Sequence, residues 1–153
     1  AALLIEAEGL LRQAQAALAA HPDVLYAGFL GDAAKEYAEA RLTAAVFAGE
    51  PLPLPGELGV DAAPYLNGLG ETVGEMRRRL LDKLRAADLA AAESLLDGMN
   101  AVCDLLADLD HPDGMTGGLR RTTDVARALV ERSRADLTNT VVQERLRRQL
   151  AGE

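Results

Sequence analysis

Five stretches of the chain place apolar residues at the spacing of an amphipathic helix. They lie at about 1–18, 22–48, 62–86, 88–109 and 118–150, and the last is compatible with one long helix or two stacked ones. Apolar positions that recur every three or four residues indicate helix, and the β-branched runs that strands favour are missing. The pattern predicts an all-α fold, an antiparallel bundle of about five to six helices in one domain covering residues 1–153.

Helix-breaking residues separate these stretches. Pro22 opens the second stretch, because the residue before a proline is biased away from the helical conformation. The proline-rich run 51–56 predicts a stiff loop. Asp88 is the expected N-cap of the fourth helix, and Asp110–Gly114 is expected to form a turn.

Two helices carry features beyond simple amphipathicity. We expect the second helix to bury one apolar stripe, which consists of Tyr26, Phe29, Ala33, Tyr37, Ala40, Ala44 and Phe47. The third helix contains Gly68, Gly70 and Gly74, although a helical glycine costs about 1 kcal/mol relative to alanine. We therefore expect a second helix or a ligand to come close to this glycine-bearing face.

Two pairs of carboxylates mark the same two helices. Glu36 and Glu39 are three residues apart, and Glu71 and Glu75 are four apart, so each pair projects from one side of its helix. If the helices face each other, the four side chains form an oxygen-ligand set of the kind that suits Mg²⁺ or Mn²⁺. Such a cation can promote phosphodiester hydrolysis. The alternative interpretation is an acidic face that only contacts water.

Charge is distributed unevenly along the chain. The net charge is −8, but residues 1–75 carry 3 basic and 11 acidic side chains, whereas residues 120–153 carry 8 and 5. An acidic protein is a poor general ligand for a phosphate backbone, yet the basic last stretch can face a polyanion. In that stretch, charges of opposite sign alternate at helical pairing distance, which also fits an exposed face of internal ion pairs.

Other classes of site receive little support. The sequence contains no glycine-rich phosphate loop and no nucleophile elbow, and His21 and His111 are isolated, so no zinc-type cluster is indicated. Cys103 lies on an apolar helix face and is expected to be a buried, inert thiol. The apolar start of the chain is interrupted by charged residues, which excludes a membrane span there and favours a cytoplasmic protein.

Blocks along nearly the whole chain resemble one protein family. They include Tyr26-Ala27-Gly28-Phe29, Glu36-Tyr37-Ala38-Glu39-Ala40, Tyr65-Leu66-Asn67-Gly68-Leu69, Gly74-Glu75-Met76-Arg77-Arg78 and Leu119-Arg120-Arg121-Thr122-Thr123-Asp124. In this order they resemble the translin and translin-associated factor X family, especially its prokaryotic and archaeal members. The resemblance implies all-helical protomers in closed barrels, usually octamers, that bind single-stranded RNA or DNA.

The resemblance also implies roles for particular residues. In the nuclease branch, carboxylates bind Mg²⁺ or Mn²⁺ and cut RNA inside the barrel; Glu36, Glu39 and Glu75 match these positions, and Glu71 stands where the family usually has aspartate. Thr122 replaces a common lysine. The family usually has a further basic N-terminal helix, which we expect to be missing here. Candidate nucleic-acid contacts are Arg77, Arg78, Arg120, Arg121, Arg127 and Arg134.

Three functions remain open at this stage. The first is a metal-dependent endoribonuclease on single-stranded RNA, in which Glu36, Glu39, Glu71 and Glu75 hold the cation. The second is a non-catalytic oligomer that binds single-stranded RNA or DNA. The third is a helical assembly protein without a nucleic-acid partner, for which the acidic charge is the evidence.

Overall fold

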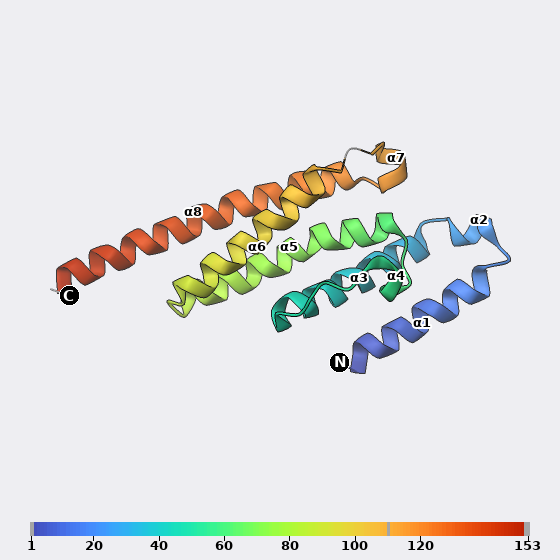
Figure 1. Cartoon of the computed structure of the whole chain (residues 1–153), viewed down its shortest axis with the longest axis horizontal. Coiled ribbons are helices and arrows are strands. Elements are labelled where there is room, and N and C mark those ends of the chain that lie inside the picture. The colour runs from blue at the N-terminus through green and yellow to red at the C-terminus, as the bar shows by residue number, and fades with distance from the viewer. Residues whose placement is uncertain (1, 110, 152–153) are drawn as a thin grey trace. The chain divides into compact units, whose positions relative to one another are not determined.

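The computed structural model describes residues 2–109 and 111–151, and all regular secondary structure in these ranges is helical (Figure 1). The five long helices are α1 (Ala2–Leu18), α3 (Phe29–Ala48), α5 (Ala62–Arg85), α6 (Leu89–Ala107) and α8 (Leu119–Ala151). Three single-turn helices lie between them, namely α2 (Pro22–Leu25), α4 (Pro55–Leu58) and α7 (Asp113–Thr116). The predicted all-α fold is confirmed, and the last stretch is one continuous helix.

The chain forms two compact units. One contains the described residues of Ala1–Thr72 and Asp110–Thr122, and the other contains those of Val73–Leu109 and Thr123–Glu153. Helices α5 and α8 each contribute residues to both units. None of the described helices combines the length and the apolar character that a membrane span requires.

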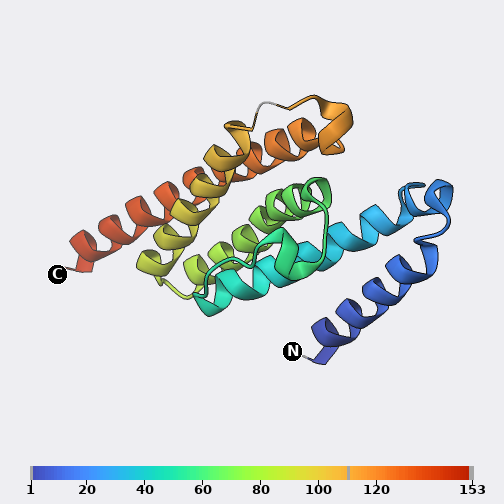
Figure 2. The same ribbon diagram turned by 45° about the vertical axis from the view of Figure 1, so that its right-hand side comes forward.

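In the first unit, α3 runs back along α1 and packs against it (Figures 1 and 2). Leu42, Leu58 and Leu69, which come from α3, α4 and α5, are almost completely buried. The predicted stiff loop contains the single-turn helix α4. The Glu57 side chain caps α4 by accepting a hydrogen bond from the Leu54 amide at 2.6 Å. This packing fixes the first half of α5 beside α3.

The helix predicted for residues 22–48 differs in two ways. It breaks after Leu25, and α3 begins only after Gly28, whose φ of +104° is a conformation that other residues rarely adopt. The predicted buried stripe is also wrong at most positions, since Tyr26 and Phe29 are 77% and 79% exposed. The buried face is rotated by about one residue, and it consists of Ala34, Tyr37, Ala38, Leu42 and Ala45.

In the second unit, the second half of α5 packs with α6 and α8. Its core follows the predicted stripes and includes Val73, Met76, Leu80, Met99, Leu106 and Val130. Asp88 caps α6 as expected, because its Oδ1 accepts a hydrogen bond from the Ala91 amide at 3.2 Å. Cys103 is buried, and burial raises the pKa of its thiol. Of the predicted turn, Asp110 lies outside the described residues, and Asp113 begins α7.

Candidate metal centre

Gly68 sets the distance between α3 and α5. A Cβ built at this position would lie 2.8 Å from the Lys35 carbonyl oxygen and 2.9 Å from the Glu39 amide nitrogen, closer than real Cβ contacts occur. The backbone of α5 therefore passes α3 where no side chain fits, which confirms the expected close approach for this glycine. Glu71 follows Gly68 by about one turn and is carried toward the same helix.

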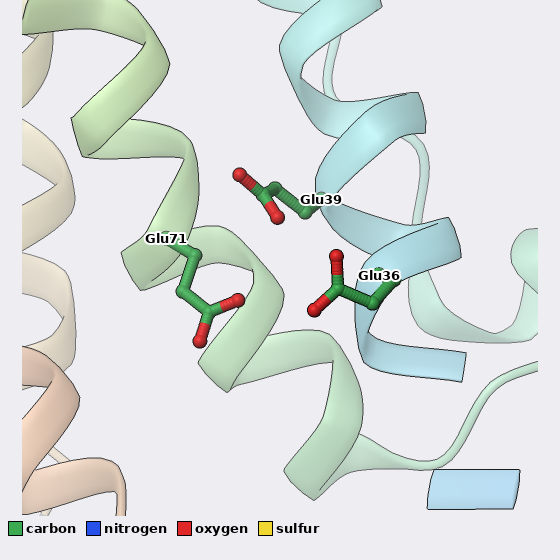
Figure 3. A group of neighbouring side chains, drawn as sticks. All are labelled: Glu36, Glu39 and Glu71. Atoms are coloured by element: carbon green, nitrogen blue, oxygen red, sulfur yellow. The ribbon is translucent and has the colours of Figure 1, made fainter. Parts of the chain in front are cut away.

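Three of the four predicted carboxylates come together in the first unit. Glu36 and Glu39 extend from α3 and Glu71 from α5, and their side chains point toward one another (Figure 3). One oxygen of each lies within 4.8 Å of the others; Glu36 is exposed, while Glu39 and Glu71 are half-buried. Mg²⁺ binds oxygens at about 2.0–2.1 Å and Ca²⁺ at about 2.3–2.6 Å, so three oxygens this close can share one hard cation after small side-chain rotations. The donor set therefore fits the expected Mg²⁺ or Mn²⁺.

A lysine ammonium, which the sequence analysis did not anticipate, faces this carboxylate group. Lys35 Nζ donates a hydrogen bond to Glu71 Oε1 at 2.8 Å and lies 3.4 Å from Glu36 Oε1. The hydrogen bond to Glu71 raises the pKa of Lys35 by favouring its charged form, and burial opposes this shift. The sequence signal was the i,i+4 spacing of Lys35 and Glu39, which places the lysine on the carboxylate side of α3.

The fourth predicted carboxylate has a different neighbour. Glu75 lies one turn beyond Glu71 along α5, and it is not a member of the three-carboxylate group. Its Oε2 accepts a hydrogen bond from Arg78 Nη1 at 3.2 Å. Its predicted part in metal binding stays a prediction.

The six candidate arginines fall into two sets. Arg120 and Arg121, at the start of α8, are exposed, and neither forms an ion pair within residues 2–109 and 111–151. The other four contact groups of their own unit. Arg77 donates to Ser133 and Asp136 at 2.8 Å each, Arg78 pairs with Glu75, Arg127 lies 3.8 Å from Asp124, and Arg134 donates to Asn100 at 3.0 Å.

The buried side chain of Asn67, next to Gly68, links the start of α5 to neighbouring segments. Asn67 Nδ2 donates to the carbonyl oxygens of Ala63 at 2.9 Å and Thr116 at 2.7 Å, and its Oδ1 accepts from Thr122 Oγ1 at 2.7 Å. The network joins the start of α5 to α7 and to the first turn of α8. Thr122, noted in the sequence as the replacement of a family lysine, thus has a structural hydrogen bond.

Two solved structures of one protein complex are similar to this chain. No protein-family model matches the chain. The structure of the AfC3PO–duplex RNA complex is similar with a TM-score of 0.80 and 33% identity, covering 92% of this chain and 72% of that chain. A crystal structure of AfC3PO gives a TM-score of 0.79 and 33% identity, covering 92% and 73%. AfC3PO is an archaeal translin/C3PO-family complex. The chain belongs to this translin-like family.

A longer relative is more distant. The uncharacterized protein MJ0175 of Methanocaldococcus jannaschii is 26% identical over 134 residues, which are 87% of this chain. The chain spans 59% of the length of that protein.

Proposed function

We propose that the chain is a subunit of a metal-dependent endoribonuclease that cuts single-stranded RNA. The observation that supports this most strongly is the meeting of Glu36, Glu39 and Glu71 from two helices, with ligand oxygens within 4.8 Å of one another. Membership of the translin-like family adds support, because these are the positions that the family resemblance marks as metal ligands. In this proposal the three side chains hold Mg²⁺ or Mn²⁺.

The proposal assigns a role to each of the residues Glu36, Glu39, Gly68, Glu71 and Glu75. When bound, a divalent cation supplies a Lewis acid that stabilises negative charge on a phosphate group. Glu36, Glu39 and Glu71 bind it and fix its place against α3 and α5. Gly68 keeps the two helices close enough for the longer glutamate arm at 71 to reach the group. Glu75, one turn further along α5, is proposed as an outer partner of the metal site; in the free subunit its Oε2 accepts a hydrogen bond from Arg78.

The proposed nucleic-acid contacts begin at the N-terminal end of α8. AfC3PO has been solved with duplex RNA, and we propose single-stranded RNA as the substrate here, with single-stranded DNA as a further ligand. Arg120 and Arg121 are the strongest contacts because both are exposed and make no ion pair in the described part of the chain. Arg77, Arg78, Arg127 and Arg134 are weaker contacts in this proposal, because each already contacts a partner within the subunit.

The subunit is proposed to work in a homo-oligomer, and the family resemblance suggests an octamer. Apolar side chains of α1 are strongly exposed, namely Leu3 at 79%, Ile5 at 73% and Leu10 at 60%. Beside them, α1 and α3 form a mainly apolar groove of about 510 Å³ that includes Leu11 and Leu30. Extensive exposed apolar surface on a globular protein is typical of a partner interface.

A second candidate function is RNA binding without cleavage. The observation that favours it is the Lys35 ammonium, which already neutralises part of the carboxylate charge through Glu71 and Glu36. In that case the carboxylate group would serve the packing of α3 on α5 and not catalysis. A helical assembly protein without nucleic acid is the third possibility, and the ion pairs along α8 fit it.

Labelled RNA distinguishes these functions. The purified protein is incubated with a single strand and with the duplex of the same sequence, in EDTA or in millimolar Mn²⁺. We expect internal cleavage of the single strand that requires Mn²⁺ and disappears in Glu39→Gln. Glu93→Gln, a change at an exposed position of α6, is the matched control and should retain cleavage. Binding of RNA without cleavage in Mn²⁺ would contradict the nuclease proposal and support the second function.

A further inference from the structure

The Lys35 ammonium lies beside the carboxylates that would bind a divalent cation. Its Nζ contacts two of the three carboxylates, at 2.8 Å from Glu71 and 3.4 Å from Glu36. Three carboxylates within 4.8 Å repel one another, and a cation among them relieves that repulsion. In the metal-free protein Lys35 supplies this positive charge from within the chain.

We propose that Lys35 is a tethered counter-cation that neutralises the carboxylate group in the metal-free protein and is displaced from Glu71 when a divalent cation binds. This inference rests on the proposed metal site. It adds that Lys35 regulates the site by lowering its affinity for the cation. Binding of the cation thereby replaces the positive charge of Lys35 with that of the metal at the same carboxylates.

Competition follows from the shared carboxylate of Glu71. Lys35 donates its hydrogen bond to Oε1 of Glu71, and the cation needs an oxygen of the same carboxylate. Mg²⁺ binds carboxylate oxygen at about 2.0–2.1 Å, so an ion on Glu71 and Glu36 would lie very near an ammonium that contacts the same side chains. Two positive charges this close repel strongly in a half-buried site.

The lysine can leave without disturbing the helices. Its backbone is fixed, because the Lys35 carbonyl lies against Gly68 of α5. Its side chain is 24% exposed and carries a compact charge on a flexible four-carbon stem, so the ammonium can swing into solvent. Release of Lys35 therefore needs rotation of a side chain and no change of fold.

Calorimetric titration of metal-free protein with MnCl₂ alone tests this proposal. The variants are Lys35→Met, which keeps the length of the stem but removes the charge, and Lys83→Met as control. Lys83 is also half-buried, with 32% of its side chain exposed, and it forms an ion pair with Asp88 at 2.9 Å in the second unit. We expect Lys35→Met to bind Mn²⁺ about tenfold more tightly than the wild type, while Lys83→Met binds with wild-type affinity.

A second readout tests the neutralising role itself. Without metal, Lys35→Met should have a lower Tm than Lys83→Met, and Mn²⁺ should raise the Tm of Lys35→Met more than that of the wild type. Lys35→Arg, which keeps a positive charge, should retain wild-type affinity for Mn²⁺. Lys35→Gln is the substitute neutral variant if Lys35→Met does not fold without metal.

The outcomes separate this inference from the metal site on which it rests. Equal or weaker Mn²⁺ binding by Lys35→Met, beside clear binding by the wild type, overturns the role of Lys35 and leaves the metal site standing. Absence of binding in both proteins at millimolar Mn²⁺ overturns the site as well. Binding by Lys35→Met alone supports strong competition by the lysine.

Discussion

Gly68 lies directly against the backbone of Glu39, and an added Cβ would come within 2.9 Å of the Glu39 amide nitrogen. The same added Cβ would lie 2.8 Å from the Lys35 carbonyl oxygen. Backbone atoms inside a helix cannot move aside as the end of a side chain can. The close passage of α5 over α3 is therefore a condition for the meeting of Glu36, Glu39 and Glu71.

Gly68→Ala should destabilise the protein. Overpacking costs about 1–3 kcal/mol, and alanine recovers about 1 kcal/mol of helix propensity. Because two of the closest contacts are backbone atoms of α3, the cost lies at the upper end, and we expect a net loss of about 2 kcal/mol in urea unfolding. Gly9→Ala in α1 is the control, because its Cβ meets nothing within 4 Å. It should be neutral or stabilising by up to about 1 kcal/mol, and equal effects of both changes would contradict the close approach.

The contribution of the Asn67 hydrogen bonds to stability can be tested at Thr122. Thr122→Val keeps the shape of the side chain but leaves the buried Asn67 Oδ1 without its 2.7 Å donor. An unsatisfied buried acceptor costs about 1–3 kcal/mol, which should appear as a lower midpoint of urea unfolding with an unchanged slope. Thr138→Val is the control, because its hydroxyl is exposed and donates only to the Arg134 carbonyl of its own helix. Equal stability of the two variants would show that the Asn67 network contributes little.

The burial of Cys103 predicts slow thiol chemistry. Burial raises the pKa of Cys103, so the thiolate that reacts with disulfide reagents is scarce near pH 8, and access is blocked as well. Native protein should react with a chromogenic disulfide reagent far more slowly than protein unfolded in urea. Rapid labelling of the native protein would place Cys103 on an accessible surface.

The start of α8 can be tested by the salt dependence of RNA binding. Arg120→Gln and Arg121→Gln should each weaken binding and reduce the slope of log affinity against log salt by about 0.7 per lost phosphate contact. Arg127→Gln should have a smaller effect, because Arg127 lies 3.8 Å from Asp124 in the free subunit. Fluorescence anisotropy with a labelled single strand measures these slopes. Identical slopes in all three variants and the wild type would exclude phosphate contacts at this end of α8.

The long helices and most of the core were predictable because their apolar periodicity is clear. In α5 and α6, large residues such as Leu69, Leu80 and Met99 stand on one side, and these are buried as predicted. Helix α3 was harder, since alanine occurs all around it and does not identify the buried face. Alanines such as Ala34 and Ala38 are buried while Ala33 is exposed, so the packing of α3 against α1 and α5 decides which side is inside.

The candidate site was predictable in its ligands but not in its neighbours. Helical spacing placed Glu36 and Glu39 on one side, and the family resemblance pointed to Glu71. The ion pair between Lys35 and Glu71 joins residues 36 positions apart and depends on the register of two helices. The hydrogen bond from Arg77 to the buried Ser133 in the second unit depends on helix packing in the same way. Periodicity specifies faces and does not specify register between helices.

Metal-induced stabilisation of the fold tests the proposed metal centre most directly. Thermal unfolding of the wild type, Glu39→Gln and Glu93→Gln is measured in EDTA and in Mn²⁺. At a hundred times its dissociation constant a ligand stabilises the native state by about 2.7 kcal/mol, which for a domain of this size raises the Tm by roughly 5–10 °C. We predict this increase for the wild type and Glu93→Gln and its loss in Glu39→Gln. An equal response of all three proteins to Mn²⁺, or no response in any, would contradict a metal centre at Glu36, Glu39 and Glu71.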